Sequence, residues 1–189
     1  MRFTEIEFKY KADDISLEAF KAFCVARKPS LQIQASGYDH FYQSAKDEAF
    51  SRHRVGADMN QLTFKRKTSD ANNIVRTEHN IDLHPSVSKE QVAAFLSEFG
   101  YEFTATLYKS CFVFQYDWYI LVYYIVFDAE MKELGRFIEI EASETFPWRS
   151  EAEARASIDD MERLCKPLGI QPQRRVKRSL FEMFASKKS

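Results

Sequence analysis

The beginning of the chain alternates between charged and apolar side chains over residues 4–11. Successive side chains of a β-strand point to opposite faces of a sheet, so this period of two predicts a strand. Its charged face carries Glu5, Glu7 and Lys9, and its apolar face carries Ile6, Phe8 and Tyr10. The apolar face must be covered by other parts of the protein, whereas the charged face needs water or charged partners.

The same period recurs along the chain and, together with helical segments, predicts the fold class. Further strands are predicted at 38–43, 50–55, 62–67, 74–83, 104–114, 119–127 and 137–142. Helices are predicted over 15–28, from Ser88 to Gly100, from Ser150 to near Pro167, and over 179–187. Turns rather than helices join the strand pairs, which is typical of an antiparallel sheet. We therefore expect an α+β fold in a single domain, 1–189: an eight-stranded antiparallel β-barrel with helices packed on the outside.

Composition restricts the classes of partner. The 189 residues include 28 acidic and 27 basic side chains, so no overall basic field favours nucleic acid or a membrane surface. The cysteines, Cys24, Cys111 and Cys165, are odd in number and widely spaced, which argues against a zinc site or a disulfide framework. The charged start at Arg2 does not fit a signal peptide, and the apolar run 118–127 is too short for a membrane-spanning helix. We expect a cytoplasmic protein that binds neither nucleic acid nor membrane.

The charged positions of the predicted strands gather into one set if helices cover the apolar face of a closed sheet. The acids are Glu5, Glu7, Glu78, Asp128, Glu139 and Glu141, and the bases are Lys9, Arg52, Arg54, Lys65, Arg76 and Lys109. Any single pair, such as Arg76 with Glu78, is better explained as a structural ion pair, but the whole set favours a binding site. Carboxylate oxygens suit Mg²⁺ or Mn²⁺, and guanidinium and ammonium groups suit phosphate oxygens. The pattern indicates a site for a polyphosphate with its metal.

An ordered series of motifs resembles the CYTH superfamily, which includes class IV adenylate cyclases, thiamine triphosphatases and inorganic triphosphatases. The series runs Glu5-x-Glu7-x-Lys9, Asp39-His40-Phe41-Tyr42, Arg52-x-Arg54, Leu62-Thr63-x-Lys65, Arg76-x-Glu78, Lys109, Leu134-Gly135-x-Phe137-x-Glu139-x-Glu141 and Ser179-x-x-Glu182. The resemblance covers nearly the whole chain. It implies a triphosphate tunnel of eight antiparallel strands with a metal-dependent site inside.

The resemblance also implies roles for individual residues. The phosphate-binding residues would be Lys9, Arg52, Arg54, Lys65, Arg76 and Lys109, with Arg178 of the tail as a further candidate. The ligands of Mg²⁺ or Mn²⁺ would be Glu5, Glu7, Asp128, Glu139 and Glu141. Lys9 and Glu78 are the candidate catalytic residues, and Glu78 would orient Arg76 or share in metal binding.

Three positions depart from the family pattern. Cys111 stands where an arginine usually follows the lysine matched by Lys109, and Leu180 stands where a tyrosine commonly follows the tail serine. Arg66 and Lys67 replace the usual small residues of a loop and add positive charge there. We expect that the phosphate anchor of the first departure is missing or supplied by another residue, and that the third departure favours bare anionic charge.

The sequence leaves three functions open. The favoured one is metal-dependent hydrolysis of a triphosphate (inorganic triphosphate, thiamine triphosphate or a nucleoside triphosphate) with release of phosphate. One alternative is a class IV adenylate cyclase that converts ATP to cyclic AMP and pyrophosphate, and the other is a non-catalytic module that binds polyphosphate or nucleotide. No residue is an evident adenine reader, so we expect inorganic triphosphate or a similarly small substrate. A homodimer is compatible with these interpretations.

Overall fold

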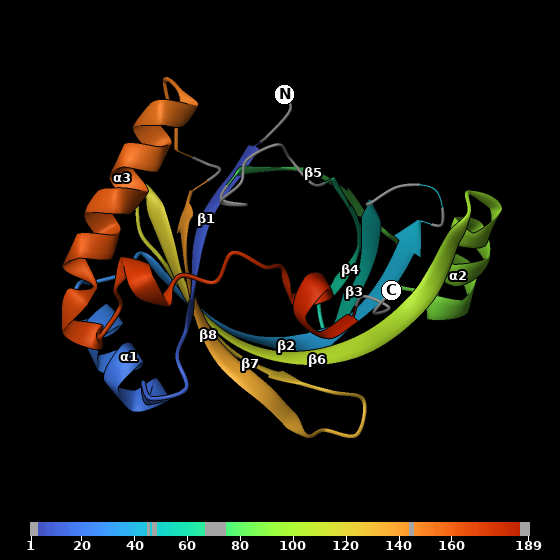
Figure 1. Ribbon diagram of the computed structural model, residues 1–189, viewed down its shortest axis with the longest axis horizontal. Coiled ribbons are helices and arrows are strands. Elements are labelled where there is room, and N and C mark those ends of the chain that lie inside the picture. The colour runs from blue at the N-terminus through green and yellow to red at the C-terminus, as the bar shows by residue number, and fades with distance from the viewer. Residues whose placement is uncertain (1–3, 45, 47–48, 67–74, 144–145, 186–189) are drawn as a thin grey trace.

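The computed structural model describes residues 4–44, 46, 49–66, 75–143 and 146–185 (Figure 1). The strands are β1 (Thr4–Lys11), β2 (Leu31–Ser44), β3 (Phe50–Gly56), β4 (Met59–Arg66), β5 (Val75–Asp82), β6 (Tyr101–Gln115), β7 (Tyr119–Phe127) and β8 (Glu133–Ala142). The helices are α1 (Leu17–Val25), α2 (Lys89–Glu98) and α3 (Glu151–Leu164), followed by short helical turns at Lys166–Leu168, Pro172–Arg174 and Phe181–Ala185.

The strands close into an antiparallel barrel with the order β1-β5-β4-β3-β2-β6-β7-β8. Closure depends on β1, which pairs with β5 through the partners Glu5 and Arg76 and with β8 through the partners Lys9 and Glu139. This confirms the predicted fold class. Because the first and last strands are neighbours, the charged face predicted for residues 4–11 lies directly beside the charged face of β8.

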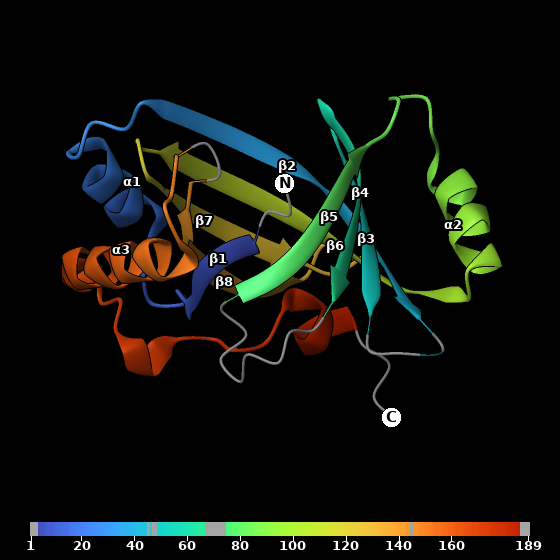
Figure 2. The same cartoon turned by 90° about the horizontal axis from the view of Figure 1, so that it is seen from above.

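Helices cover the outside of the barrel on two sides (Figures 1 and 2). Helices α1 and α3 pack over β1, β6, β7 and β8, and the buried residues of this core include Phe8, Phe20, Phe114, Tyr123, Ile140, Ile158 and Met161. Helix α2 lies on the opposite side, where Val92 and Leu96 pack against Tyr42 and Leu62. The apolar face of the strands therefore points outward beneath the helices, and the charged face points inward.

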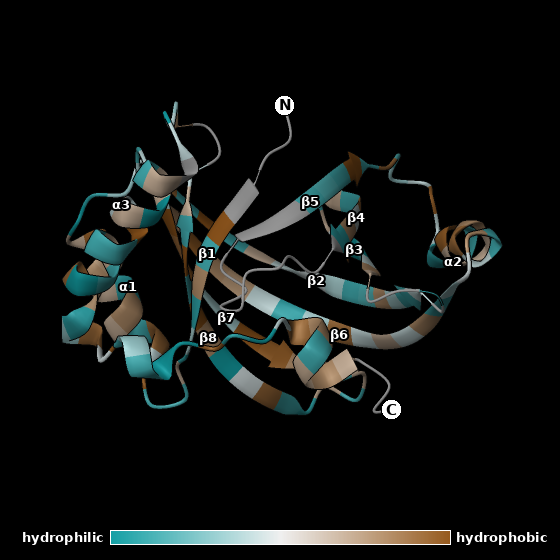
Figure 3. Ribbon diagram, turned by 45° about the horizontal axis from the view of Figure 1, so that its top comes forward, coloured by the Kyte–Doolittle hydropathy of each residue, from teal (hydrophilic) through white to brown (hydrophobic). Residues whose placement is uncertain are grey.

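Serine caps fix the starts of the helices, as their sequences predict. Ser88 and Gln91 form a capping box before α2, and the side chain of Ser150 accepts a hydrogen bond from the backbone N–H of Glu153. The helices carry both hydrophilic and hydrophobic segments in Figure 3, consistent with one face packed and one exposed. Among the described residues, none of the helices is both long and apolar enough to cross a membrane.

Strand β2 is longer than the predicted strand at 38–43. It pairs with β6 over its whole length, from Leu31 to Ser44, but its pairing with β3 begins only at Gly37. The sequence pattern suggested a strand only after Gly37 because a glycine is typical of a turn. In the described part of the chain, residues 31–36 therefore have a strand neighbour on one side, and their side chains are exposed.

The tail returns from α3 to the barrel. The backbone N–H of Val176 donates to the carbonyl of Lys9 at 2.7 Å, and the guanidinium of Arg175 lies 3.6 Å from the ring centre of Phe8. Further along, the ring of Phe181 stacks on Phe50 with centroids 4.5 Å apart. Leu180, Phe181 and Ala185 belong to a buried cluster with Phe41, Leu107 and Phe137, so the tail occupies one end of the barrel interior.

Gly37 is required where β2 and β3 approach each other. A Cβ atom at this position would overlap the carbonyl oxygen of Val55 and would lie 3.1 Å from the Cα of Gly56. We expect Gly37→Ala to lower the free energy of unfolding by about 1–3 kcal/mol, because backbone atoms must move to make room. Chemical denaturation measures the effect, with the adjacent Ser36→Ala as the control. Equal stability of the two variants would contradict the close approach.

Candidate active site

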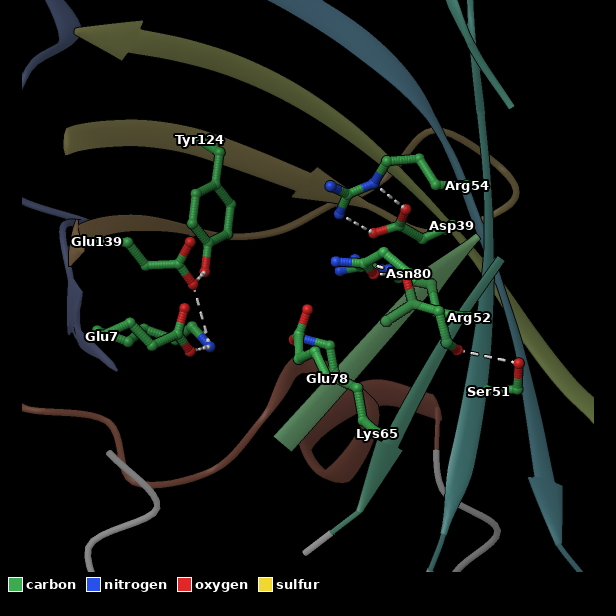
Figure 4. A network of polar contacts seen from close by, with 12 residues as sticks. Glu7, Asp39, Ser51, Arg52, Arg54, Lys65, Glu78, Asn80, Tyr124 and Glu139 are labelled. Atoms are coloured by element: carbon green, nitrogen blue, oxygen red, sulfur yellow. Dashed lines mark hydrogen bonds and ion pairs between the residues drawn. The ribbon is translucent and has the colours of Figure 1, made fainter. Parts of the chain in front are cut away.

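The barrel encloses a cavity of about 710 Å³, within the size range of small-molecule sites, about 300–1,000 Å³. All eight strands and the tail contribute to its lining. Nine of the residues predicted for the site lie in this lining, namely Glu7, Lys9, Arg52, Arg54, Lys65, Glu78, Lys109, Glu139 and Glu141. The structure therefore brings acids and bases from distant parts of the sequence to one cavity (Figure 4).

Three carboxylates meet where β1 pairs with β8. Oxygen atoms of Glu7, Glu139 and Glu141 all lie within 4.8 Å of one another. The amine of Lys9 is 3.1 Å from Oε1 of Glu139 and 3.5 Å from Oε1 of Glu7, so it offsets part of their repulsion. A cluster of hard oxygen donors at this spacing has the chemistry to hold Mg²⁺ or Mn²⁺.

Tyr124 connects this acidic cluster to a base. Its hydroxyl donates to Oε1 of Glu139 at 2.7 Å, and Nζ of Lys109 lies 3.9 Å from the centre of its ring. Burial raises the pKa of Tyr124 well above its usual value, and the nearby charge of Glu139 acts in the same direction. The phenol therefore stays protonated and can act as a fixed donor to the carboxylate.

Across the cavity from the acidic cluster, Asp39 of β2 and Arg54 of β3, which are partners across these strands, form an ion pair. Nε and Nη2 of Arg54 donate to the two carboxylate oxygens of Asp39 at 2.6 and 2.9 Å. Burial alone would raise the pKa of Asp39, but the Arg54 guanidinium outweighs it and holds that pKa well below its usual range. Asp39 therefore remains an anion that fixes the direction of Arg54 in the cavity.

The remaining bases of this wall also have polar neighbours. Arg52 donates to Oγ1 of Thr63 at 3.3 Å, and the hydroxyl of Thr63 donates to Oδ1 of Asn80 at 2.7 Å. Lys65 forms an ion pair with Glu78, its partner across β4 and β5. Glu78 thus holds Lys65 in the cavity wall. Its predicted roles, to orient Arg76 or to share in metal binding, stay predictions.

Two predicted residues lie elsewhere. The carboxylate of Asp128 accepts hydrogen bonds from the backbone N–H groups of Glu130 and Lys132 at 3.0 and 2.8 Å, so it stabilises the turn between β7 and β8. Arg178 is exposed and donates to the backbone carbonyl of Glu182. The structure does not bring Asp128 to the acidic cluster, and it places Leu180 and Phe181 of the tail, rather than Arg178, in the cavity lining.

Four predicted positions cannot be placed by their side chains. Glu5 and Arg76 are backbone partners across β1 and β5, but their side chains lie outside the described part of the structure. The side chain of Arg66 and all of Lys67 also lie outside it. The metal role of Glu5, the phosphate role of Arg76 and the effect of the basic pair therefore stay predictions.

Two of the departures from the family pattern face the cavity. Cys111 and Leu180 both belong to its lining. Burial raises the pKa of the Cys111 thiol, although the charges of Lys109 and Arg54 act against it. A protonated thiol cannot replace a guanidinium as a phosphate ligand, so this part of the wall relies on Lys109 and Arg54 for positive charge.

Sequence reasoning missed Asp39 and Tyr124 as site residues. Asp39 stood in a recognised motif, and the hairpin register that pairs it with Arg54 was the available signal. Tyr124 lies within a continuous apolar run, where no alternation shows which side chains point inward. Both residues act on the site through a predicted residue, Arg54 or Glu139.

Comparison with solved structures shows the same fold in other proteins. A conserved hypothetical protein from Pyrococcus furiosus superposes with a TM-score of 0.74 at 22% identity, covering 95% of this chain and 99% of that chain. A candidate adenylate cyclase from Vibrio parahaemolyticus gives 0.68 at 14% identity, covering 97% and 98%. Another candidate adenylate cyclase, from Bacillus halodurans, gives 0.59 at 18% identity, covering 96% and 97%.

These matches confirm the fold that the sequence motifs indicated, and two of the matched proteins are described as candidate adenylate cyclases. No family model matches the chain, and a comparison with curated proteins finds no match.

The pair of Asp39 and Arg54 predicts a pH-dependent stability. Asp39→Asn leaves the half-buried guanidinium without an anion, and a hydrogen bond to a charged group contributes about 1.5–3 kcal/mol, so stability should fall by this amount at neutral pH. A lowered folded-state pKa contributes stability above the unfolded value of about 4, which is lost as pH falls through the folded pKa. Urea unfolding at pH 7 and pH 3 should therefore show a smaller difference between the two proteins at pH 3.

The matched control is Asp14→Asn, because Asp14 pairs with Arg174 on the surface at 2.6 Å. Its effect should be much smaller, since water screens an exposed ion pair. Equal losses in the two variants would contradict a special role for Asp39.

Proposed function

We propose that this protein is a metal-dependent enzyme that hydrolyses a triphosphate at its terminal phosphoanhydride and releases orthophosphate. The observation that carries the proposal is the arrangement of one cavity, in which a cluster of three carboxylates faces a wall of bases. The bases of the wall are Arg52, Arg54, Lys65 and Lys109, the carboxylates are Glu7, Glu139 and Glu141, and Lys9 lies between two of these carboxylates. Such an arrangement suits a polyanion bound together with a divalent cation.

The bases would bind the phosphate chain. Arg52 and Arg54 are the third and fifth residues of β3 and so share one face of this strand, and Lys65 comes from the neighbouring β4. Guanidinium groups match phosphate oxygens with paired donors, and the ammonium groups add point charges. Because Asp39 and Glu78 hold Arg54 and Lys65, little side-chain freedom is lost when the phosphates bind.

The acidic cluster fits the metal ion that the resemblance of the sequence motifs implies. Glu7, Glu139 and Glu141 would hold Mg²⁺ or Mn²⁺, and Glu5 is a further candidate on the same strand. When bound, the ion would neutralise phosphate charge and orient the attacking water. Tyr124 keeps one oxygen of Glu139 engaged at 2.7 Å and so fixes the direction of this carboxylate.

Lys9 has the position of a catalytic residue. Its amine lies between the carboxylates of Glu7 and Glu139, and it faces the cavity. An ammonium group at this point would stabilise negative charge that develops on phosphate oxygens as the anhydride bond breaks. Glu78 contributes indirectly, because its ion pair keeps Lys65 in the wall.

Cyclisation of ATP is the second candidate function, favoured by the structural likeness to two candidate adenylate cyclases. The same bases would hold the triphosphate, but the ribose 3′-hydroxyl would attack the α-phosphorus and pyrophosphate would leave. The two reactions therefore differ in which phosphorus lies in line with the nucleophile.

Turnover of a panel of triphosphates tests the function. Inorganic triphosphate, thiamine triphosphate and ATP are each incubated with Mg²⁺ or Mn²⁺, and the products are separated by chromatography. We expect orthophosphate, and we expect Glu139→Gln to lower the rate at least a hundredfold by weakening metal binding. Glu133→Gln is the control, since Glu133 pairs with Arg136 at the surface.

The other outcomes would either assign a different function or contradict the proposed metal site. Cyclic AMP and pyrophosphate from ATP, with inorganic triphosphate untouched, would replace hydrolysis by cyclisation. Tight triphosphate binding without any product would favour the non-catalytic binding module. Full activity of Glu139→Gln at limiting metal would contradict the assignment of the acidic cluster.

Tyr124→Phe tests the support of Glu139 without relying on turnover. Loss of a group that orients a metal ligand typically costs about 10- to 100-fold in metal affinity, so we expect at least a tenfold weaker response in a Mn²⁺ titration. Tyr123→Phe is the matched control, because the hydroxyl of Tyr123 donates to the backbone carbonyl of Ile15, on the outer side of the barrel. Unchanged Mn²⁺ affinity in Tyr124→Phe would exclude this role.

A further inference from the structure

Three polar residues form a row of direct neighbours across β3, β4 and β5, which we call the Arg52 row. Arg52 of β3 lies opposite Thr63 of β4, and Thr63 lies opposite Asn80 of β5. Arg52 and Asn80 belong to the cavity lining, and Thr63 between them is fully buried. Figure 4 shows Arg52 and Asn80 on the side of the cavity that faces Glu7 and Glu139.

The position of Asn80 on β5 lies between two acids. Glu78, Asn80 and Asp82 are spaced by two residues and therefore share one face of this strand. Glu78 forms an ion pair with Lys65, and Asp82 accepts a hydrogen bond from Gln61. A carboxylate in place of Asn80 would cancel part of the positive charge that the wall presents to phosphates. A carboxamide instead offers an acceptor oxygen without a charge.

The chemistry of the three groups fixes the direction of each hydrogen bond in the Arg52 row. A guanidinium has only donors, so Nη2 of Arg52 donates to Oγ1 of Thr63 at 3.3 Å. The hydroxyl has a single proton, which it donates to Oδ1 of Asn80 at 2.7 Å. Asn80 therefore keeps this proton turned away from Arg52, and the hydroxyl oxygen stays an acceptor. Because Thr63 is fully buried, bulk water cannot replace these bonds.

We propose, on the basis of the triphosphate site above, that Asn80 is a positioning residue of that site. It acts through Thr63, whose oriented hydroxyl holds the guanidinium of Arg52 in the direction of the phosphate chain. A guanidinium carries five N–H donors, so one can be held by Thr63 while others meet phosphate oxygens. The gain is a base that is fixed before the ligand arrives, without an additional negative charge on β5.

Binding of a triphosphate that resists hydrolysis tests the proposal. Inorganic diimidotriphosphate is titrated calorimetrically with Mn²⁺ present, and chromatography checks that it is recovered unchanged. Asn80→Leu, which is similar in size but lacks the acceptor, should weaken binding about fivefold, the scale of one neutral hydrogen bond. Thr63→Val should have the same effect, whereas Thr63→Ser, which keeps the hydroxyl, should bind like the wild type.

A double-mutant cycle with Arg52→Gln separates positioning from a direct contact. If Asn80 acts through Arg52, Asn80→Leu should cause no further loss of affinity in the Arg52→Gln background, because the group that it positions is gone. An equal loss in both backgrounds would contradict the proposal, since Asn80 would then act on the ligand independently of Arg52. Urea unfolding shows that each variant is folded, and Asn80→Leu decides the test if the buried change Thr63→Val prevents folding.

Gln61→Leu is the matched control. Gln61 is another amide of the cavity lining, but it lies opposite Arg54 rather than Arg52, and its amide N–H donates to Asp82 at 3.0 Å. Any effect of Gln61→Leu on affinity should therefore be the same with and without the arginine at position 52.

The remaining outcomes separate this inference from the function on which it rests. Arg52→Gln should itself weaken binding, because it removes a phosphate contact. If it does so while Asn80→Leu and Thr63→Val bind like the wild type, the phosphate site is supported and Asn80 has no positioning role in it. If the wild-type protein does not bind the ligand, the triphosphate site itself is refuted and this inference with it.

Discussion

Burying charge inside a closed sheet is the constraint on which this structure depends. A charged side chain removed from water needs a partner of opposite sign, and the strand registers supply these partners. Lys9 lies beside Glu139 of β8, Arg54 beside Asp39 of β2, and Lys65 beside Glu78 of β5. A polyanion bound in the cavity would therefore meet bases that Asp39 and Glu78 already hold in position, rather than isolated and mobile charges.

The charged half of the site could be predicted because its strands are amphipathic. Strict alternation in β1 and β8 shows that Glu7, Lys9 and Glu139 share a face, and closure of the barrel turns that face inward. The inward-facing residues of β7, Tyr124 among them, could not be predicted. This strand is hydrophobic on both faces, so its sequence does not show which side chains point into the barrel. Asp128 shows a further limit, because a strand-end aspartate in a charged pattern equally suits a turn.

Support from outside the barrel reaches the site through the tail. Tyr10 and Arg175 both contact Glu162 of α3, at 2.6 and 2.7 Å, and the next residue, Val176, binds the backbone of Lys9. The raised pKa of Tyr10, which burial causes, keeps this phenol a donor. A helix on the outer face thereby fixes the strand that carries Lys9 and Glu7 toward the cavity.

The partly paired strand β2 has a consequence for the protein's behaviour in concentrated solution. Residues 31–36 lack charge and proline, and in the described part of the chain they have a strand neighbour only in β6. Natural sheets usually protect such edges with lysine, proline or a bulge, because a free edge can template the addition of a foreign strand. Colloidal stability should therefore be limited by this short segment rather than by the acid–base balance of the whole surface.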